Sequence, residues 1–152
     1  MRVTGKAAKQ MAKKLGVEMP KAKSHKVALR GVHASSVHFQ LPWPPSTNNL
    51  YVNVGKRRVP SQGLRTFKKK AAAALLEMTG HVTGAVSVHI TAHPPDNRRR
   101  DIDGLMKAPL DATTEAGIWE DDSQIKRLEI CLENKSVTFP EGTLCISIWE
   151  IV

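Results

Sequence analysis

The sequence predicts an α+β fold, a mixed β-sheet of about four main strands combined with two helices. Val86, Val88 and Ile90 alternate with polar residues, which is the period of a half-buried strand. Two stretches rich in helix-forming residues lie on either side of that strand. A basic segment, residues 1–35, precedes the predicted domain of residues 36–152, and we expect this segment to be a flexible arm.

In the first half of the domain, the sequence predicts a strand, an irregular loop, a hairpin and a helix. A strand at 37–41 leads into the segment 42–49, where prolines remove backbone donors and prevent regular structure. Two short strands, 51–54 and 58–60, flank a turn at Gly55-Lys56. A second turn at 61–63 then precedes a helix from Leu64 to Met78, which stops near Gly80.

The second half predicts three further strands and one helix. In order, these are a strand at 84–93, a helix at 103–116, a strand at 124–133, a turn at 139–142 and a final strand at 144–151. Asp103 is a plausible helix N-cap and Gly117 a terminator. The apolar spacing shifts between Ile125 and Leu128, which indicates a bulge or a late strand start.

The positive charge is concentrated at the N-terminus. The net charge is +9, and residues 1–30 contribute nine Lys and Arg against the single acid Glu18. Such an excess favours a polyanion, nucleic acid first, but composition alone does not assign DNA binding to the rest of the chain. The arm is therefore either a solvated tail or a segment that becomes ordered on DNA and adds phosphate contacts.

Membrane and zinc sites are not expected. No apolar run approaches the ~20 residues of a membrane helix, and no apolar segment follows the basic N-terminus as in a secretory signal. We therefore expect a cytoplasmic protein. Cys131 and Cys145 are read as reduced and packed, and no ligands are paired in sequence as zinc sites require. The six histidines show no ligand spacing, so no role is assigned to them.

Two groups of carboxylates flank the second predicted helix. Asp101 and Asp103 come one residue apart after a strand, and Glu120-Asp121-Asp122 follows the helix. With one helix between them, we expect both groups to reach the same end of the sheet. Oxygen ligands suit Mg²⁺, which is typically held by a few carboxylates while water and phosphate complete its coordination. The alternative is that these residues are solvated turns and helix caps.

Basic residues surround these carboxylates. Arg98, Arg99 and Arg100 can bind phosphates through their guanidinium groups, or can merely neutralise their acidic neighbours. Lys107 can contact a phosphate oxygen, although its spacing alone favours an ion pair with Asp103 or Asp111. The remaining predicted phosphate contacts, with solvated surface as the alternative, are Lys56, Arg57, Arg58, Arg65, Lys68, Lys69 and Lys70.

Two tryptophans lie near these groups. Trp43, within the proline-rich loop, is read as a packed loop anchor, with a wedge against opened DNA bases as the alternative. Trp119 is expected to pack against the core beside the second acidic group.

In their order along residues 37–151, several motifs resemble the RusA family of Holliday junction resolvases. The motifs are Leu41–Asn48, Pro94-Pro95-Asp96, Arg98–Asp103, Lys107, Asp111-Ala112 and Ala116–Ile125. The resemblance implies a small homodimeric endonuclease that cuts four-way DNA junctions with Mg²⁺ or Mn²⁺. It also implies that Asp101, Asp103 and Asp122 are the essential metal-binding aspartates, that Lys107 is the essential lysine and that Asp121 assists.

Two positions depart from the family pattern. The family usually has Asn where this chain has Gly104, so an amide that could orient a ligand is missing. The chain also has Pro109 where an apolar helix former is usual, and proline kinks a helix unless the helix begins late. These departures motivate one alternative, a junction-binding protein with a weakened or inactive nuclease. A broader flap or branched-DNA nuclease with the same site also stays open.

Overall fold

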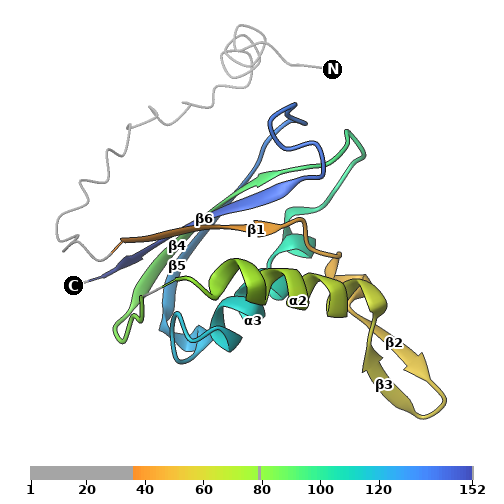
Figure 1. Ribbon diagram of the computed structural model, residues 1–152, viewed down its shortest axis with the longest axis horizontal. Helices are drawn as coiled ribbons and strands as arrows, with labels where there is room; N and C mark the ends of the chain where they lie inside the picture. Colours follow the sequence, from red (N-terminus) through yellow and green to blue (C-terminus); the bar gives the residue numbers. More distant parts are fainter. Residues whose placement is uncertain (1–35, 79, 152) are drawn as a thin grey trace, which may run out of the picture. The chain divides into compact units, whose positions relative to one another are not determined.

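The computed structural model describes residues 36–78 and 80–151, which form an α+β domain (Figure 1). The predicted arm, 1–35, lies outside the described residues. The main sheet contains β1 (Ser36–Pro42), β4 (Val86–His93), β5 (Ile125–Leu132) and β6 (Thr143–Glu150). Its strand order is β1-β6-β4-β5. The predicted mixed sheet of four main strands is confirmed.

The sheet is mixed because its strands pair in both directions. β6 is antiparallel to β1 and to β4, whereas β5 runs parallel to β4 and forms one edge of the sheet. Val86 pairs with Ile125 and Ser87 with Arg127, so Lys126 is skipped as a bulge. The bulge predicted from the apolar spacing is therefore confirmed.

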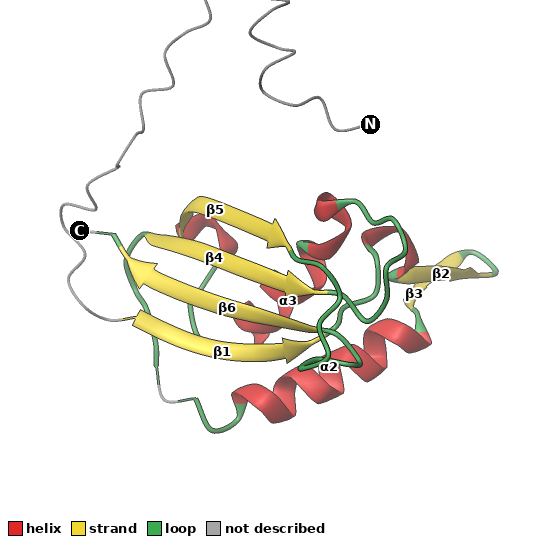
Figure 2. Cartoon of the chain, turned by 90° about the horizontal axis from the view of Figure 1, so that it is seen from above, coloured by secondary structure: helices red, strands yellow, loops and turns green. Residues whose placement is uncertain are grey.

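Two helices cover one face of the sheet, α2 (Gln62–Leu75) and α3 (Lys107–Glu115) (Figure 2). The alternating residues Val86, Val88, Ile90 and Ala92 of β4 are fully buried at the centre of the sheet. The core partners on the helices lie at helical spacing and are Leu64, Phe67, Ala71 and Leu75 of α2 and Ala108 and Ala112 of α3. The other face of the sheet carries half-buried, mostly polar side chains, among them His89 and Thr91 of β4.

Helix α2 begins two residues earlier than predicted. The segment 61–63 is not a separate turn, because the Ser61 hydroxyl accepts a hydrogen bond from the backbone N–H of Leu64 at 3.1 Å and caps the helix. The helix also ends earlier, at Leu75, and a short turn carries the chain to Met78.

Helix α3 begins later than predicted, at Lys107 rather than after Asp103. Pro109 explains the difference: it has no N–H to donate to the carbonyl four residues before it, so it fits only in the first turn of a helix. Asp103 instead lies in the 3₁₀ turn η2 (Ile102–Leu105), and its predicted role as N-cap of the helix is wrong. The predicted end is confirmed, because Gly117 has a φ of 74° and donates to the Thr114 carbonyl.

The predicted hairpin forms a separate two-stranded sheet of β2 (Tyr51–Val54) and β3 (Arg57–Pro60). Val54 pairs with Arg57, so Gly55 and Lys56 form a two-residue turn in which Gly55 has a φ of 60°. The hairpin extends away from the main sheet (Figure 2). In the described part of the chain, no helix is long and apolar enough to cross a membrane.

Candidate functional site

Asp101 and Asp103 are exposed and are held by the backbone of η2. The Asp101 carbonyl accepts from the N–H of Gly104 at 3.2 Å. The Thr47 hydroxyl, from the proline-rich loop, reaches the carbonyls of Asp103 and Gly104 at 3.4 and 3.2 Å. No residue within 36–78 and 80–151 pairs with either carboxylate, so their oxygens are available to a ligand.

The loop before Asp101 is organised around Asp96. Arg98 and Arg100 bind its carboxylate with Nη2–Oδ distances of 2.9 and 2.7 Å. The backbone hydrogen bond from Arg98 and the side-chain hydrogen bond from Arg100 lower the pKa of Asp96 to about 2. Two of the three predicted phosphate-binding arginines therefore pair with an acidic neighbour, although the Arg98 side chain stays 84% exposed. Arg99 is exposed as well.

The Arg100 guanidinium also lies 5.3 Å from the centre of the Trp43 ring, and Trp43 packs against the core. The prediction that Trp43 anchors the loop is thus supported. The loop and the end of β5 line a groove of about 650 Å³, whose walls run from Pro94 to Asp101 and from Leu132 to Lys135.

Three side chains continue from this region along the exposed side of α3. Lys107, Asp111 and Thr114 lie at i, i+4 and i+7, which places them on one helical face. The Nζ of Lys107 is 3.2 Å from Oδ2 of Asp111. Of the two ion pairs that the spacing of Lys107 suggested, with Asp103 or with Asp111, the one with Asp111 is present.

Asp122 lies at the far end of this row and is fixed by two donors. Its Oδ1 accepts a hydrogen bond from the Thr114 hydroxyl and one from Nε1 of Trp119 at 3.2 Å. The same Trp119 nitrogen donates to the Thr114 oxygen at 2.6 Å. Trp119 itself is buried, as predicted, with 1% of its surface exposed. The core thus positions one oxygen of an exposed carboxylate, and no residue of the described ranges 36–78 and 80–151 pairs with Oδ2.

The neighbouring Asp121 has a structural role. It caps the 3₁₀ turn η3 (Asp122–Gln124) by accepting from the N–H of Ser123 at 2.8 Å, and hydrogen bonds from Ser123 lower its pKa. Gln124 holds the turn in place, because its amide donates to the carbonyls of Val82 and Gly84 at 2.9 Å.

The two acidic groups do not reach the same end of the sheet, and that expectation was wrong. Because β5 is parallel to β4, the chain leaves β4 at one end of the sheet and enters β5 at the other. The nine residues of α3, about 13 Å at the usual helical rise, lie between η2 and η3. Among the described residues, Asp101, Asp103 and Asp122 do not form a group of three ligands within 4.8 Å.

The other predicted phosphate contacts lie on the hairpin and on α2. We name Lys56, Arg57 and Arg58 the hairpin basic cluster, and all three are exposed. On α2, Arg65, Lys69 and Lys70 are exposed as well. Lys68 instead forms an ion pair with Glu115 of α3, and this hydrogen-bonded contact raises its pKa. Lys68 therefore connects the two helices.

Sequence reasoning missed Thr114. Its position on the same helical face as Lys107 was readable from the sequence, but the return of Asp122 to that face depends on the turn after Gly117.

Comparison with known proteins gives a consistent result. Residues 42–141 match the family model described as endodeoxyribonuclease RusA. Relatives named crossover junction endodeoxyribonuclease RusA include one from Enterobacteria phage 82, 38% identical over 94 residues, which are 60% of this chain and 78% of the relative. One from Escherichia coli K12 is 41% identical over 88 residues, 56% of this chain and 72% of the relative. Another, from Escherichia coli O139:H28, is 39% identical over 117 residues, 73% of this chain and 92% of the relative. The chain belongs to the RusA family of endodeoxyribonucleases.

Proposed function

We propose that this chain is a Mg²⁺-dependent endonuclease that resolves Holliday junctions by paired cleavage of phosphodiester bonds, with Asp101, Asp103 and Asp122 as metal ligands. The relatives named crossover junction endodeoxyribonuclease support the substrate class. The observation that carries the proposed site is the row of polar side chains on one face of α3, with the exposed Asp101 and Asp103 before its start and the fixed Asp122 after its end.

The donor set fits a hard cation. Asp101 and Asp103 offer only oxygens, both are exposed and neither is paired with a described residue, as ligands of Mg²⁺ or Mn²⁺ should be. Bound Mg²⁺ supplies Lewis-acid polarisation of the phosphodiester and an acidified water. The protein contributes the positions of the carboxylates, the hydrogen bonds that fix Asp122 and the positive charge around them.

Lys107 is the proposed electrostatic catalyst. Its ammonium group is half-exposed and is paired with Asp111, so a phosphate oxygen can attract it while charge develops in the transition state. Asp111 then serves as a positioning residue that keeps Lys107 on the face shared with Thr114. Arg99 and the hairpin basic cluster are proposed to contact phosphates farther along the DNA arms.

The ligand assignment is tested by titrating Mn²⁺ into the protein and into Asp101→Asn, Asp103→Asn and Asp122→Asn variants. A site shared by all three predicts weaker Mn²⁺ binding in each variant. A single metal ion bound by all three aspartates also requires Asp122 to come close to Asp101 and Asp103, although α3 lies between them. Either η2 moves toward Asp122, or the Asp122 of a second copy of the chain completes the site. If the Asp122→Asn variant binds Mn²⁺ with wild-type affinity but no longer cleaves the junction, Asp122 is not a metal ligand but still takes part in catalysis.

We also propose that the chain acts as a homodimer, because a two-fold symmetric junction presents two equivalent strands to two sites. Light scattering during gel filtration tests this, and a monomer that cuts both strands would contradict it.

The proposed arm, residues 1–35, would add phosphate contacts. Deletion of residues 1–30 should weaken junction binding and flatten the dependence of affinity on salt. An unchanged salt slope would refute that role.

A second candidate is a junction-binding protein with a weakened nuclease. It is favoured by Gly104, which lacks the usual amide, whereas Pro109 no longer supports it because α3 begins late enough to accept proline. Tight junction binding without cutting at any Mg²⁺ or Mn²⁺ concentration is its signature. Cutting of flaps and junctions at equal rates would instead indicate the broader branched-DNA nuclease.

A further inference from the structure

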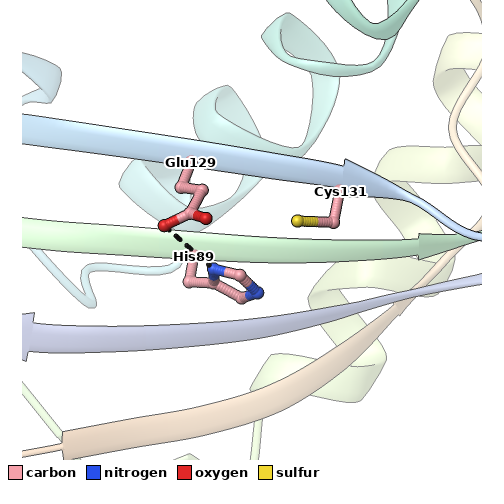
Figure 3. Close-up of side chains that lie close together, drawn as sticks. All are labelled: His89, Glu129 and Cys131. Carbon is pink, nitrogen blue, oxygen red and sulfur yellow. Dashed lines mark ion pairs between the residues drawn. The ribbon is translucent and has the colours of Figure 1, made fainter. Parts of the chain in front are cut away.

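The sheet face opposite α2 and α3 carries a group of side chains that the proposed nuclease site does not use. On β4, His89 and Thr91 point to this face and alternate with the buried Val88 and Ile90. The parallel register places His89 beside Glu129 and Thr91 beside Cys131 of β5. Figure 3 shows the imidazole, carboxylate and thiol turned toward one another across the two strands.

The three side chains lie close enough together to share one metal ion. One ligand atom from each of His89, Glu129 and Cys131 lies within 4.8 Å of the other two. Ligands of a tetrahedral zinc ion are about 3.5 Å apart, given metal–ligand bonds of about 2.0–2.3 Å. Rotation of the half-exposed side chains is enough to close that difference, because all three start from neighbouring positions on hydrogen-bonded strands.

The histidine is already oriented for such a role. Its Nδ1 lies 3.6 Å from Oε2 of Glu129, and its Nε2 lies 3.2 Å from the Thr91 hydroxyl. Ligating histidines commonly donate their second ring N–H to an oxygen, which fixes the tautomer that binds the metal. Thr91 provides that oxygen, which leaves Nδ1 to face Glu129.

We propose that His89, Glu129 and Cys131 form a second metal site, which binds a borderline-soft divalent cation of the Zn²⁺ type with water in the fourth position. Nitrogen, sulfur and oxygen donors together suit zinc, whereas Mg²⁺ prefers the all-oxygen donors of the aspartates. The ion would connect the edge strand β5 to β4. This site stands independently of the proposed nuclease mechanism.

The ligands could not be recognised in the sequence, since His89 is 40 positions from Glu129 and 42 from Cys131. Zinc motifs show paired ligands on one local segment, whereas here the pairing comes from the register of two strands. The pairing of β4 with β5 brings the imidazole near the thiol, and the spacing of these residues along the sequence does not predict their proximity.

Cobalt absorption tests the proposal, because a thiolate bound to Co²⁺ gives a charge-transfer band that carboxylates do not. The untagged 152-residue chain is titrated with Co²⁺ in excess Mg²⁺, which occupies the oxygen sites. Cys145→Ser is the matched control, because Cys145 is also half-buried on this face and pairs with Thr91 from the opposite side. We expect the band in the wild type and in Cys145→Ser, its loss in Cys131→Ser, and its displacement by Zn²⁺.

Two further measurements keep the test decisive if Cys131→Ser folds poorly. His89→Gln retains the thiol and should bind Zn²⁺ at least about tenfold more weakly than the wild type. Zn²⁺ should raise the unfolding temperature of the wild type but not that of His89→Gln. A wild type without the sulfur–cobalt band, or an unchanged Zn²⁺ affinity in His89→Gln, overturns the proposal.

Discussion

Thr114→Val removes one hydroxyl group from the pair of donors that holds Asp122. Valine keeps the shape of threonine, so α3 should remain folded while Oδ1 of Asp122 loses its shortest hydrogen bond. A hydrogen bond to a charged group contributes about 1.5–3 kcal/mol, and the exposure of Asp122 favours the lower figure. If that free energy positions the carboxylate in the transition state, junction cleavage should slow about tenfold.

Thr113→Val is the matched control for this change. Thr113 is the neighbouring threonine on the same helix, but it is fully buried and its hydroxyl donates to the Pro109 carbonyl, away from Asp122. The assay is single-turnover cleavage of a labelled four-way junction over a range of Mn²⁺ concentrations, with thermal unfolding measured in parallel. Thr114→Ser, which restores the hydroxyl, should recover most of the rate.

At equal folded fractions, Thr114→Val should cleave the junction about tenfold more slowly than the wild type, whereas Thr113→Val should cleave it at the wild-type rate. If Thr114→Val cuts at the wild-type rate while Asp122→Asn is inactive, the hydrogen bond does not position Asp122 for catalysis. If both valine variants lose activity equally, the effect arises from the stability of α3.

Three other predictions address the surrounding structure. Gly104→Asn should raise the cleavage rate severalfold if the missing amide limits activity. A Cβ at position 104 lies 3.3 Å from the Ser46 hydroxyl, so the Ser46 side chain must move slightly to accommodate asparagine. An unchanged or lower cleavage rate would contradict the idea that the missing amide limits activity. The low pKa of Asp96 means that its arginine contacts stabilise the fold above about pH 4 and are lost as pH falls toward 2. Stability measured against pH should show this step in the wild type and not in Asp96→Asn. Alanine replacement of the hairpin basic cluster should flatten the salt dependence of junction binding. Lys68→Ala should mainly lower the stability of the fold, because Lys68 pairs with Glu115. Equal salt slopes for both variants would argue against this distinction.

The strands were predictable because each half-buried strand carries its own signal. The alternation from Val86 to Ala92 identifies β4, and the displaced spacing between Ile125 and Leu128 identifies the bulge in β5. Helix ends were less predictable, since Asp103 resembles a cap in isolation. Pro109, six residues later, excludes an α-helix that begins at Asp103.

The candidate site was predictable as a set of residue types and less so as an arrangement. The sequence brings Asp101 and Asp103 together because they are neighbours. It does not show that β5 runs parallel to β4, which places Asp122 beyond the far end of α3. The contacts from Thr114 and Trp119 to Asp122, and that between His89 and Glu129, depend on tertiary packing or strand register, which local patterns do not encode.

Cleavage of a labelled four-way junction by the wild type and by Asp101→Asn, with Mg²⁺ or Mn²⁺, tests the central claim most directly. The wild type should cut paired strands only when the metal is present. Asp101→Asn should bind the junction with similar affinity but leave it intact, because the variant loses a metal ligand without losing positive charge. Equal cleavage by both proteins would contradict the assignment of Asp101 to the metal site.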